Sequence, residues 1–299
     1  MSPTLKQYLH WIGSALAITG IVFVSFRLSD YSSQLDLSRF NSFAWAIAAG
    51  LAIIYGLANI LLALSWRIIL GYFGANASPR WSVRIYGLTQ LAKYIPGNIM
   101  HLAGRQAMGQ AAGISGWPLA KAAIWELGLI SITGLSFTIF VIPQFLSTVS
   151  VPMAAGGFTC LLIIITMILK NYVSQAIALS FGYYLLFLVI SGSIFVGSIL
   201  LTTNQNPIAP SDWPLFCGAF IVAWLAGLVT PGAPAGVGVR ELVLVVLLKG
   251  LVSESDLLLS VLLARVVTVA GDMLFFLLAS ILRCREPNFT QGASENQLR

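Results

Sequence analysis

Long apolar runs with almost no charge occupy most of this chain, and they exclude a soluble fold. A helix that crosses a bilayer needs about 20 apolar residues, and the segments that reach this length are about 8–28, 43–66, 118–142, 152–169, 176–202 and 256–282. Only 9% of the residues are charged, whereas soluble domains carry roughly 25%. We therefore predict an all-α, polytopic integral membrane protein. Its six spans form a single transmembrane domain over residues 1–285, and a polar, disordered tail follows over 286–299.

Two further apolar segments, 79–113 and 213–250, are interrupted by Pro and Gly. The first contains KYIPGNIMHLAGR and the second contains LVTPGAPAGVGVREL. Proline removes a backbone donor and glycine permits a positive φ, so each Pro-Gly pair is expected to end a helix. Unpaired backbone groups in hydrocarbon cost several kcal/mol each, so such breaks persist only inside protein or against a watery cavity. We expect each segment to form a re-entrant hairpin that returns to the side from which it entered.

Basic residues flank one side of the predicted spans, whereas turns such as PQFLSTVSVP on the other side carry little charge. Lys and Arg accumulate on the cytoplasmic side of membrane proteins. We therefore expect both termini in the cytoplasm of a bacterial inner membrane, with segment 79–113 entering from the cytoplasm and 213–250 from outside. A scattered distribution of this kind does not favour nucleic acid as a partner. The basic residues assigned to the cytoplasmic side are Lys6, Arg67, Arg80, Arg84, Lys93, Arg105, Lys121, Lys170, Arg283, Arg285 and Arg299.

The two broken segments share a spacing. Arg105 follows Pro96 by nine residues, and Arg240 follows Pro231 by the same distance. A long apolar span with buried ionisable residues comes after each segment. Related units that enter from opposite faces are typical of transporters, whose binding sites lie near the midplane at broken helices. One shared spacing favours an inverted repeat without establishing it.

Candidate binding residues lie at the two breaks and on the spans that follow them. A helix that restarts after a break directs free N–H groups toward the cavity, which favours an anion such as a lipid phosphate or a carboxylate. A charge at the centre of a span costs ~2.5–3.5 kcal/mol on insertion scales, so each should face a partner or a cavity. The candidates are Pro96, Gly97, Asn98, His101, Arg105, Glu126, Pro231, Gly232, Gly236, Arg240, Glu241, Arg265 and Asp272.

Each of these features also has a purely structural interpretation. Pro and Gly often make only kinks in spanning helices, the buried charges can form an ion-pair network, and a lone histidine such as His101 is more often a packing residue. The sequence contains no phosphate loop, metal cluster, nucleophile triad or dinucleotide fingerprint. We therefore expect no cofactor, no metal and no enzymatic activity.

The stretches KYIPGNIMHLAGR, AAIWELGLI, TPGAPAGVGVREL and LLARVVTVAGD resemble the transmembrane region of lysylphosphatidylglycerol synthases, from about residue 40 to 282. The resemblance implies a flippase-like protein, because in two-domain relatives this region is held to move aminoacylated phospholipid across the bilayer. The synthase domain is missing here, so aminoacyl transfer is not expected. The second motif also departs from the usual Pro-Gly-Gly form, because Ala233-Pro234-Ala235 precedes Gly236.

We expect the chain to bind an anionic or aminoacylated lipid between the two hairpins and to move it between leaflets. Stand-alone relatives occur beside glycan-assembly genes, which makes a polyprenyl phosphate or glycolipid as plausible a substrate as phosphatidylglycerol. The alternative function is a non-transporting lipid-binding or scaffold partner of a membrane glycosyltransferase. The residues expected to hold phosphate are Arg105, Arg240 and Arg265, and those expected to pair with them or with a cationic headgroup are Glu126, Glu241 and Asp272.

Overall fold

The computed structural model describes residues 40–95, 99–146, 148–203, 208–230 and 238–283, together with Tyr8, Trp11, Val22 and Phe26. The named elements in these ranges are all helical, as the sequence predicted. They are α2 (Ser42–Tyr72), α3 (Pro79–Gln90), η2 (Leu91–Tyr94), α4 (Met100–Ala111), α5 (Gly116–Ser136), η3 (Phe137–Phe140), α6 (Ile142–Phe145), α7 (Val151–Ile168), η4 (Leu169–Val173), α8 (Gln175–Thr202), η5 (Pro210–Asp212), α9 (Trp213–Val229), α10 (Val239–Leu247) and α11 (Glu254–Ile281).

Six helical stretches of the described chain are long and apolar enough to cross a membrane: Ser42–Tyr72, Gly116–Phe145, Val151–Val173, Gln175–Thr202, Pro210–Val229 and Glu254–Ile281. Five of them correspond to predicted spans. The predicted span 8–28 falls outside the described residues apart from the four isolated ones, and the predicted tail 286–299 is also outside them. The sixth stretch, Pro210–Val229, was expected to be one arm of a hairpin instead.

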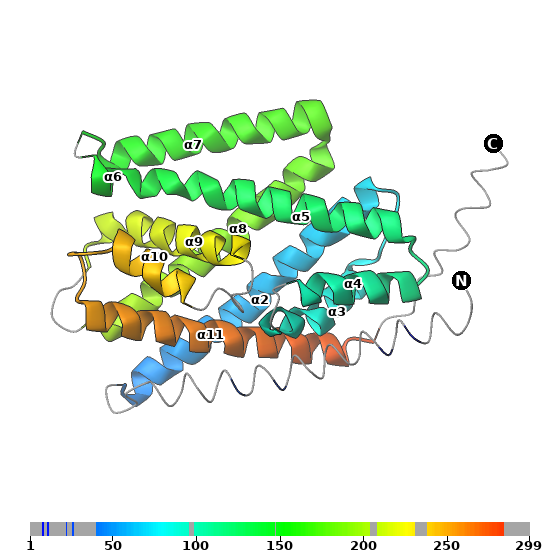
Figure 1. Cartoon of the computed structure of the whole chain (residues 1–299), viewed down its shortest axis with the longest axis horizontal. Coiled ribbons are helices and arrows are strands. Elements are labelled where there is room, and N and C mark those ends of the chain that lie inside the picture. Colours follow the sequence, from blue (N-terminus) through cyan, green and yellow to red (C-terminus); the bar gives the residue numbers. More distant parts are fainter. Residues whose placement is uncertain are drawn as a thin grey trace.

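The first broken segment folds as a short helical hairpin. The chain enters α3 at the end of the molecule where α2 stops, and it leaves α4 at the same end, where α5 begins (Figure 1). Both α3 and α4 have 12 residues, or about 18 Å of helix, whereas the hydrocarbon core is about 30 Å thick. Neither arm can therefore cross the membrane.

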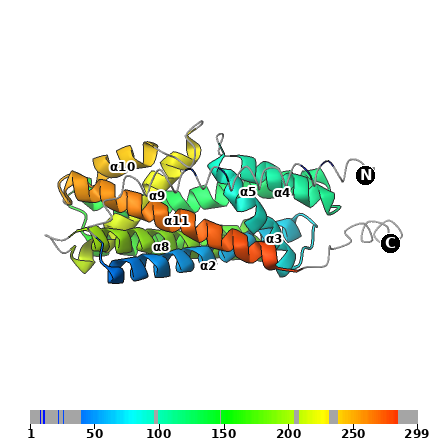
Figure 2. The same cartoon turned by 90° about the horizontal axis from the view of Figure 1, so that it is seen from below.

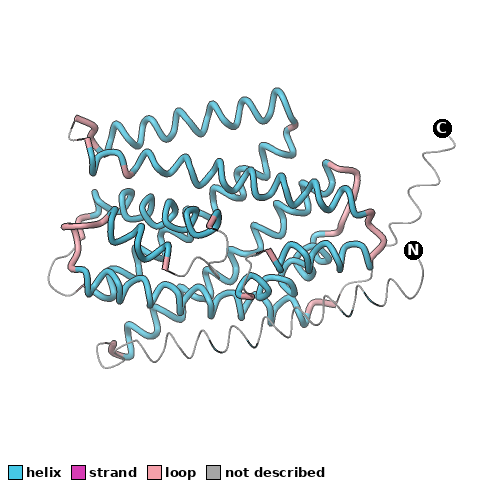
Figure 3. The backbone as a smooth tube through the Cα atoms, viewed as in Figure 1, coloured by secondary structure: helices cyan, strands magenta, loops and turns pink. Residues whose placement is uncertain are grey.

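The second broken segment folds back at the opposite end of the molecule. Helices α9 and α10 lie antiparallel, and the chain leaves α10 at the end where it entered α9 (Figure 1). Although Pro210–Val229 meets the length criterion for a span, α10 has only nine residues, which is about 14 Å. In the perpendicular view α10 and α4 again lie toward opposite ends of α11 (Figure 2). Loops of the described chain lie at both ends of the bundle, and short ones also lie near its middle (Figure 3).

Helices α2, α8 and α11 pack against one another in the centre of the bundle. The closest approach between α2 and α11 occurs at two glycines. A Cβ atom on Gly271 would lie 2.6 Å from the Ala52 carbonyl oxygen, and one on Gly56 would lie 2.9 Å from the Gly271 oxygen. No side chain fits between the two backbones at this point. The contact places Asn59, about one turn after Gly56, beside Asp272.

Helix α7 differs from the other long helices because it lies at the margin of the bundle (Figure 1). Only 6% of its apolar window is buried, against 39–56% for the other five stretches. One of its contacts is the ring of Phe158, which lies 4.9 Å from that of Phe137 and 4.7 Å from that of Phe140. Most of the surface of α7 is therefore exposed on the outside of the bundle.

Candidate functional site

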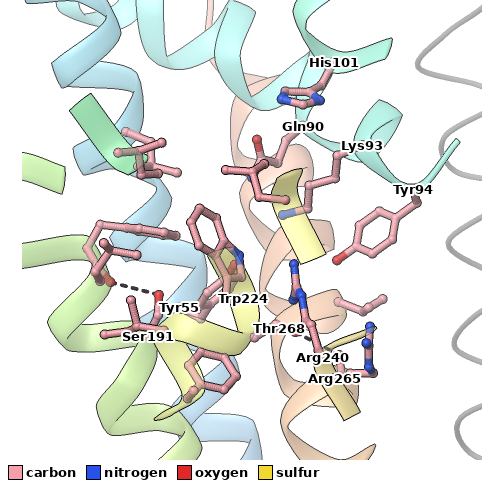
Figure 4. Close-up of a pocket in the computed structure, with 18 of the residues that line it drawn as sticks. Tyr55, Gln90, Lys93, Tyr94, His101, Ser191, Trp224, Arg240, Arg265 and Thr268 are labelled. Atoms are coloured by element: carbon pink, nitrogen blue, oxygen red, sulfur yellow. Dashed lines mark hydrogen bonds between the residues drawn. The ribbon is translucent and has the colours of Figure 1, made fainter. Parts of the chain in front are cut away.

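A cavity of about 110 Å³ lies between the two hairpins. The first hairpin contributes polar residues to its wall, the second contributes Trp224 and Arg240, and α11 contributes Arg265 and Thr268. The close-up shows these side chains reaching the cavity from separate elements (Figure 4). The polar residues from the first hairpin are Gln90, Lys93, Tyr94 and His101, and aromatic residues that complete the wall include Tyr55, Tyr86, Phe187 and Phe220.

Asp272 on α11 anchors the tip of the first hairpin. Its Oδ2 atom lies 2.7 Å from the Lys93 ammonium and accepts a 2.5 Å hydrogen bond from the Tyr94 hydroxyl. Its Oδ1 atom accepts hydrogen bonds from the side-chain amides of Gln90 and Asn59, at 3.2 and 3.3 Å. The Asp272 side chain is fully buried, whereas 21% of the Lys93 side chain is exposed and borders the cavity.

A second buried ion pair joins α4 to α5. The Arg105 Nη1 atom donates to Glu126 Oε2 at 2.7 Å, and the Tyr86 hydroxyl donates to Glu126 Oε1 at 2.8 Å. Both charged side chains are at least nine-tenths buried. The guanidinium carbon of Arg105 also lies 4.2 Å from the centre of the Tyr86 ring, which provides a cation–π contact. Glu126 borders the cavity, and Arg105 lies behind it.

The third ion pair joins α11 to the start of α10. Arg265 Nε donates to Glu241 Oε1 at 2.6 Å, and Glu241 Oε2 accepts from the Gly238 N–H at 2.8 Å. Gly238 has a φ of 86°, a conformation that glycine adopts readily and other residues rarely do. The first turn of α10 is thus capped by the side-chain carboxylate of Glu241. The expectation that this helix start offers its N–H groups to a ligand is therefore wrong for the N–H of Gly238.

Arg240 differs from the other intramembrane cations around the cavity. Its Nε atom is buried without a hydrogen-bond partner, and its guanidinium makes no ion pair with any described residue. The centre of the Trp224 ring lies 6.0 Å from the guanidinium carbon of Arg240. In Figure 4 the Arg240 guanidinium and the Lys93 ammonium point toward the same part of the cavity. Arg240 therefore brings to the cavity a positive charge that has no ion-pair partner among the described residues.

The structure separates the predicted candidates into two groups. His101, Glu126, Arg240 and Arg265 line the cavity. The others lie behind the wall in ion pairs: Arg105 with Glu126, Glu241 with Arg265, and Asp272 with Lys93. The equal Pro-to-Arg spacing does not give equal environments, because Arg105 pairs with Glu126 whereas Arg240 has no ion-pair partner among the described residues. The candidates Pro96, Gly97, Asn98, Pro231, Gly232 and Gly236 lie outside the described residues.

Several residues of this site were not predicted from the sequence, and two charged residues lie elsewhere than expected. Lys93 and Arg105 were counted as cytoplasmic, but Lys93 pairs with Asp272 and Arg105 is buried on Glu126. Lys93 stands three residues before Pro96. This position, next to the break of the expected re-entrant hairpin, was the one sequence feature that could have indicated that Lys93 lies inside the bundle. Asn59, Tyr86, Gln90 and Trp224 gave no signal that distinguishes them from other polar or aromatic residues in a span.

The fold and the site together define an all-α, multi-pass membrane protein with a partly charged cavity between two opposed hairpins. No protein-family model matches the sequence, and neither a curated protein nor a solved structure matches it. The resemblance to the transmembrane region of lysylphosphatidylglycerol synthases therefore stays a prediction.

Proposed function

We propose that this protein binds a lipid with an anionic headgroup in the cavity between the hairpins and moves that headgroup between the two leaflets. The observation that carries the proposal is the position of Arg240, a cation that lies beside the cavity and has no ion-pair partner among the described residues. A buried charge without a partner is unfavourable in a membrane and is typical of a substrate pathway. A lipid phosphate would supply the missing negative charge, and a guanidinium can bind it through two hydrogen bonds.

The location of the cavity supports movement across the bilayer as well as binding. The two hairpins start from opposite ends of the bundle, and both contribute to one cavity. Sites of this kind occur in transporters with inverted repeats, where rigid units rock around a central site. The aromatic and aliphatic residues of the wall would keep the headgroup away from hydrocarbon chains while it crosses.

The charges at the two ends of the bundle support an orientation for the protein. Basic residues gather at the end where α2, α7 and α11 finish and where α3 and α5 begin: Arg67, Arg80, Arg84, Lys121, Lys170 and Arg283. The opposite end carries Asp212, Glu254 and Asp256 together with Lys249. By the positive-inside rule, the first end is the cytoplasmic one in a bacterial inner membrane.

A leaflet-exchange assay tests this proposal. The purified chain is reconstituted into phosphatidylcholine liposomes that contain acyl-labelled fluorescent phosphatidylglycerol, and dithionite is added to bleach the outer leaflet. We expect continued bleaching of inner-leaflet lipid in protein-containing vesicles. Replacing Arg240 by Gln should slow this phase by about tenfold or more, which corresponds to about 1.4 kcal/mol of lost stabilisation.

Lys249→Gln is the matched control, because it removes the same charge from an exposed position outside the cavity. Its bleaching rate should equal that of the wild type. If the wild-type protein retains lipid through purification but leaves the inner leaflet as protected as in empty liposomes, translocation is excluded. The non-transporting lipid-binding function would then be the better account.

A further inference from the structure

The cavity is bordered by hydrogen-bond donors, and its carboxylates are already occupied. All six oxygen atoms of Glu126, Glu241 and Asp272 accept a hydrogen bond or ion pair from the chain itself. The other acids of the described chain, Asp212, Glu254 and Asp256, lie in or beside the first turns of helices at one end of the bundle. Each of these three carboxylates also has a cation of the chain as its ion-pair partner, so none of the described carboxylates around the cavity has an uncompensated charge to offer an ammonium group.

Among the described residues, the cations around the cavity exceed the carboxylates by one. Four cations line the cavity or pair with its carboxylates, namely Lys93, Arg105, Arg240 and Arg265, and they face the three carboxylates just named. Four minus three leaves one positive charge, and it belongs to Arg240. A ligand with one negative charge would make the site neutral, whereas a second negative charge would need an ion pair to open first.

We infer that the headgroup bound by this cavity carries a single negative charge and no ammonium group, as an anionic phosphodiester does, with Arg240 on its phosphate. This inference rests on the proposed lipid-binding function and specifies its substrate class. It separates the chain from a carrier of aminoacylated phospholipid, the substrate class that the sequence resemblance implied. A buried ammonium without a carboxylate has no compensation for its lost hydration.

The same charge balance disfavours a phosphomonoester. Such a headgroup carries roughly −1.5 to −2 charges at neutral pH, while a phosphodiester carries one. Full neutralisation of the second charge would require Lys93 to leave Asp272 or Arg265 to leave Glu241. Both pairs are close, at 2.7 and 2.6 Å, so the dianion should bind less well.

Competitive lipid binding to the purified full chain tests the inference. Native mass spectrometry is recorded at pH 8 with equimolar dioctanoyl phosphatidylglycerol, lysyl-phosphatidylglycerol, phosphatidylcholine and phosphatidate, which differ only in the headgroup. We expect phosphatidylglycerol adducts to exceed lysyl-phosphatidylglycerol and phosphatidylcholine adducts by about tenfold, or about 1.4 kcal/mol. In Arg240→Gln that preference should fall to within about twofold, and in Lys249→Gln it should be unchanged.

Glu241→Gln provides an independent test, in which the binding of a dianionic lipid should increase. It removes the Glu241 carboxylate from its ion pair with Arg265 and raises the excess charge by one, so phosphatidate adducts should rise relative to phosphatidylglycerol adducts by about tenfold. The inference is overturned if the wild type takes lysyl-phosphatidylglycerol or phosphatidylcholine as readily as phosphatidylglycerol, or if neither variant changes the ranking. Selective binding without leaflet exchange would contradict the proposed translocation alone. Leaflet exchange of lysyl-phosphatidylglycerol as fast as that of phosphatidylglycerol would contradict this inference alone.

Discussion

Asp272 shows how individual residues organise the interior of this protein. Its carboxylate is fully buried. It accepts hydrogen bonds from Asn59 on α2, from Gln90 at the end of α3, and from residues of the 3-10 helix η2 that follows α3. A carboxylate with several donors and a cation is well compensated in a low-dielectric interior. The same interaction fixes Lys93 at the cavity edge, so one buried acid positions a residue of the candidate site.

The Arg105–Glu126 pair leads to a stability prediction. Removing one partner of a buried ion pair leaves an uncompensated charge and costs ~3–5 kcal/mol, whereas removing both can be nearly neutral. We expect Glu126→Gln to lower the melting temperature strongly, and Arg105→Gln combined with Glu126→Gln to recover most of the loss. Thermal unfolding of the detergent-solubilised protein measures both. A double variant less stable than either single variant would contradict this account of the pair.

Arg265 gives a rescue prediction, because its carboxylate partner is now identified. Arg265→Ala leaves Glu241 without its cation, so the yield of monodisperse protein should fall. Adding Glu241→Gln should restore the yield, while adding Glu126→Gln or Asp272→Asn should lower it further. Size-exclusion profiles of fluorescent fusions measure these yields. Rescue by Asp272→Asn instead would show that Arg265 depends on a different acid.

The sequence indicated that Glu126, Arg265 and Asp272 are buried ionisable groups, but it did not indicate how they pair. Arg265 and Asp272 lie seven residues apart on one face of α11, yet each pairs with a different hairpin. Asp272 and Lys93 are 179 residues apart in the chain. Helical periodicity constrains neighbours within one helix, and it contains no information on contacts between distant helices.

At the scale of elements, two short hairpins were predictable because Pro-Gly breaks cannot continue a helix. The lengths of their arms were less predictable. The apolar stretch Pro210–Val229 is as long as a span, and only the nine-residue α10 after it returns the chain. The cap of α10 was also not foreseen, because adjacent Arg240 and Glu241 gave no indication that the acid would turn back to Gly238.

The glycine contact between α2 and α11 supports a prediction about packing. Gly271→Ala places a methyl group 2.6 Å from a backbone oxygen of α2, so the helices must separate and the Asn59–Asp272 hydrogen bond must lengthen. Overpacking of this kind typically costs 1–3 kcal/mol, which we take as about the expected loss here. Gly128→Ala is the matched control, because a Cβ there would meet no atom within 4 Å. Its melting temperature should equal or exceed that of the wild type.

At the scale of the whole molecule, the opposed hairpins and the uneven charge of the two ends predict a topology. Ser115 lies before α5 at the basic end, and Ser253 caps α11 at the other end. In cells that express single-cysteine variants on a background without Cys160, Cys217 and Cys284, an impermeant maleimide should label position 253 from outside. Position 115 should react only after permeabilisation. The reverse pattern would invert the proposed orientation.

The unpaired charge of Arg240 has an electrical consequence. The empty cavity holds one net positive charge inside the membrane, whereas a cavity filled by a monoanion is neutral. A transmembrane voltage acts on a charge with about 2.3 kcal/mol per 100 mV for a full crossing. In the proposed orientation, a potential that is negative inside would therefore pull the unoccupied site toward the cytoplasmic leaflet and exert no net pull on the occupied one. In the proposed transport cycle, voltage would bias the return of the empty site, and the lipid-carrying step would depend on the concentration gradient of the lipid.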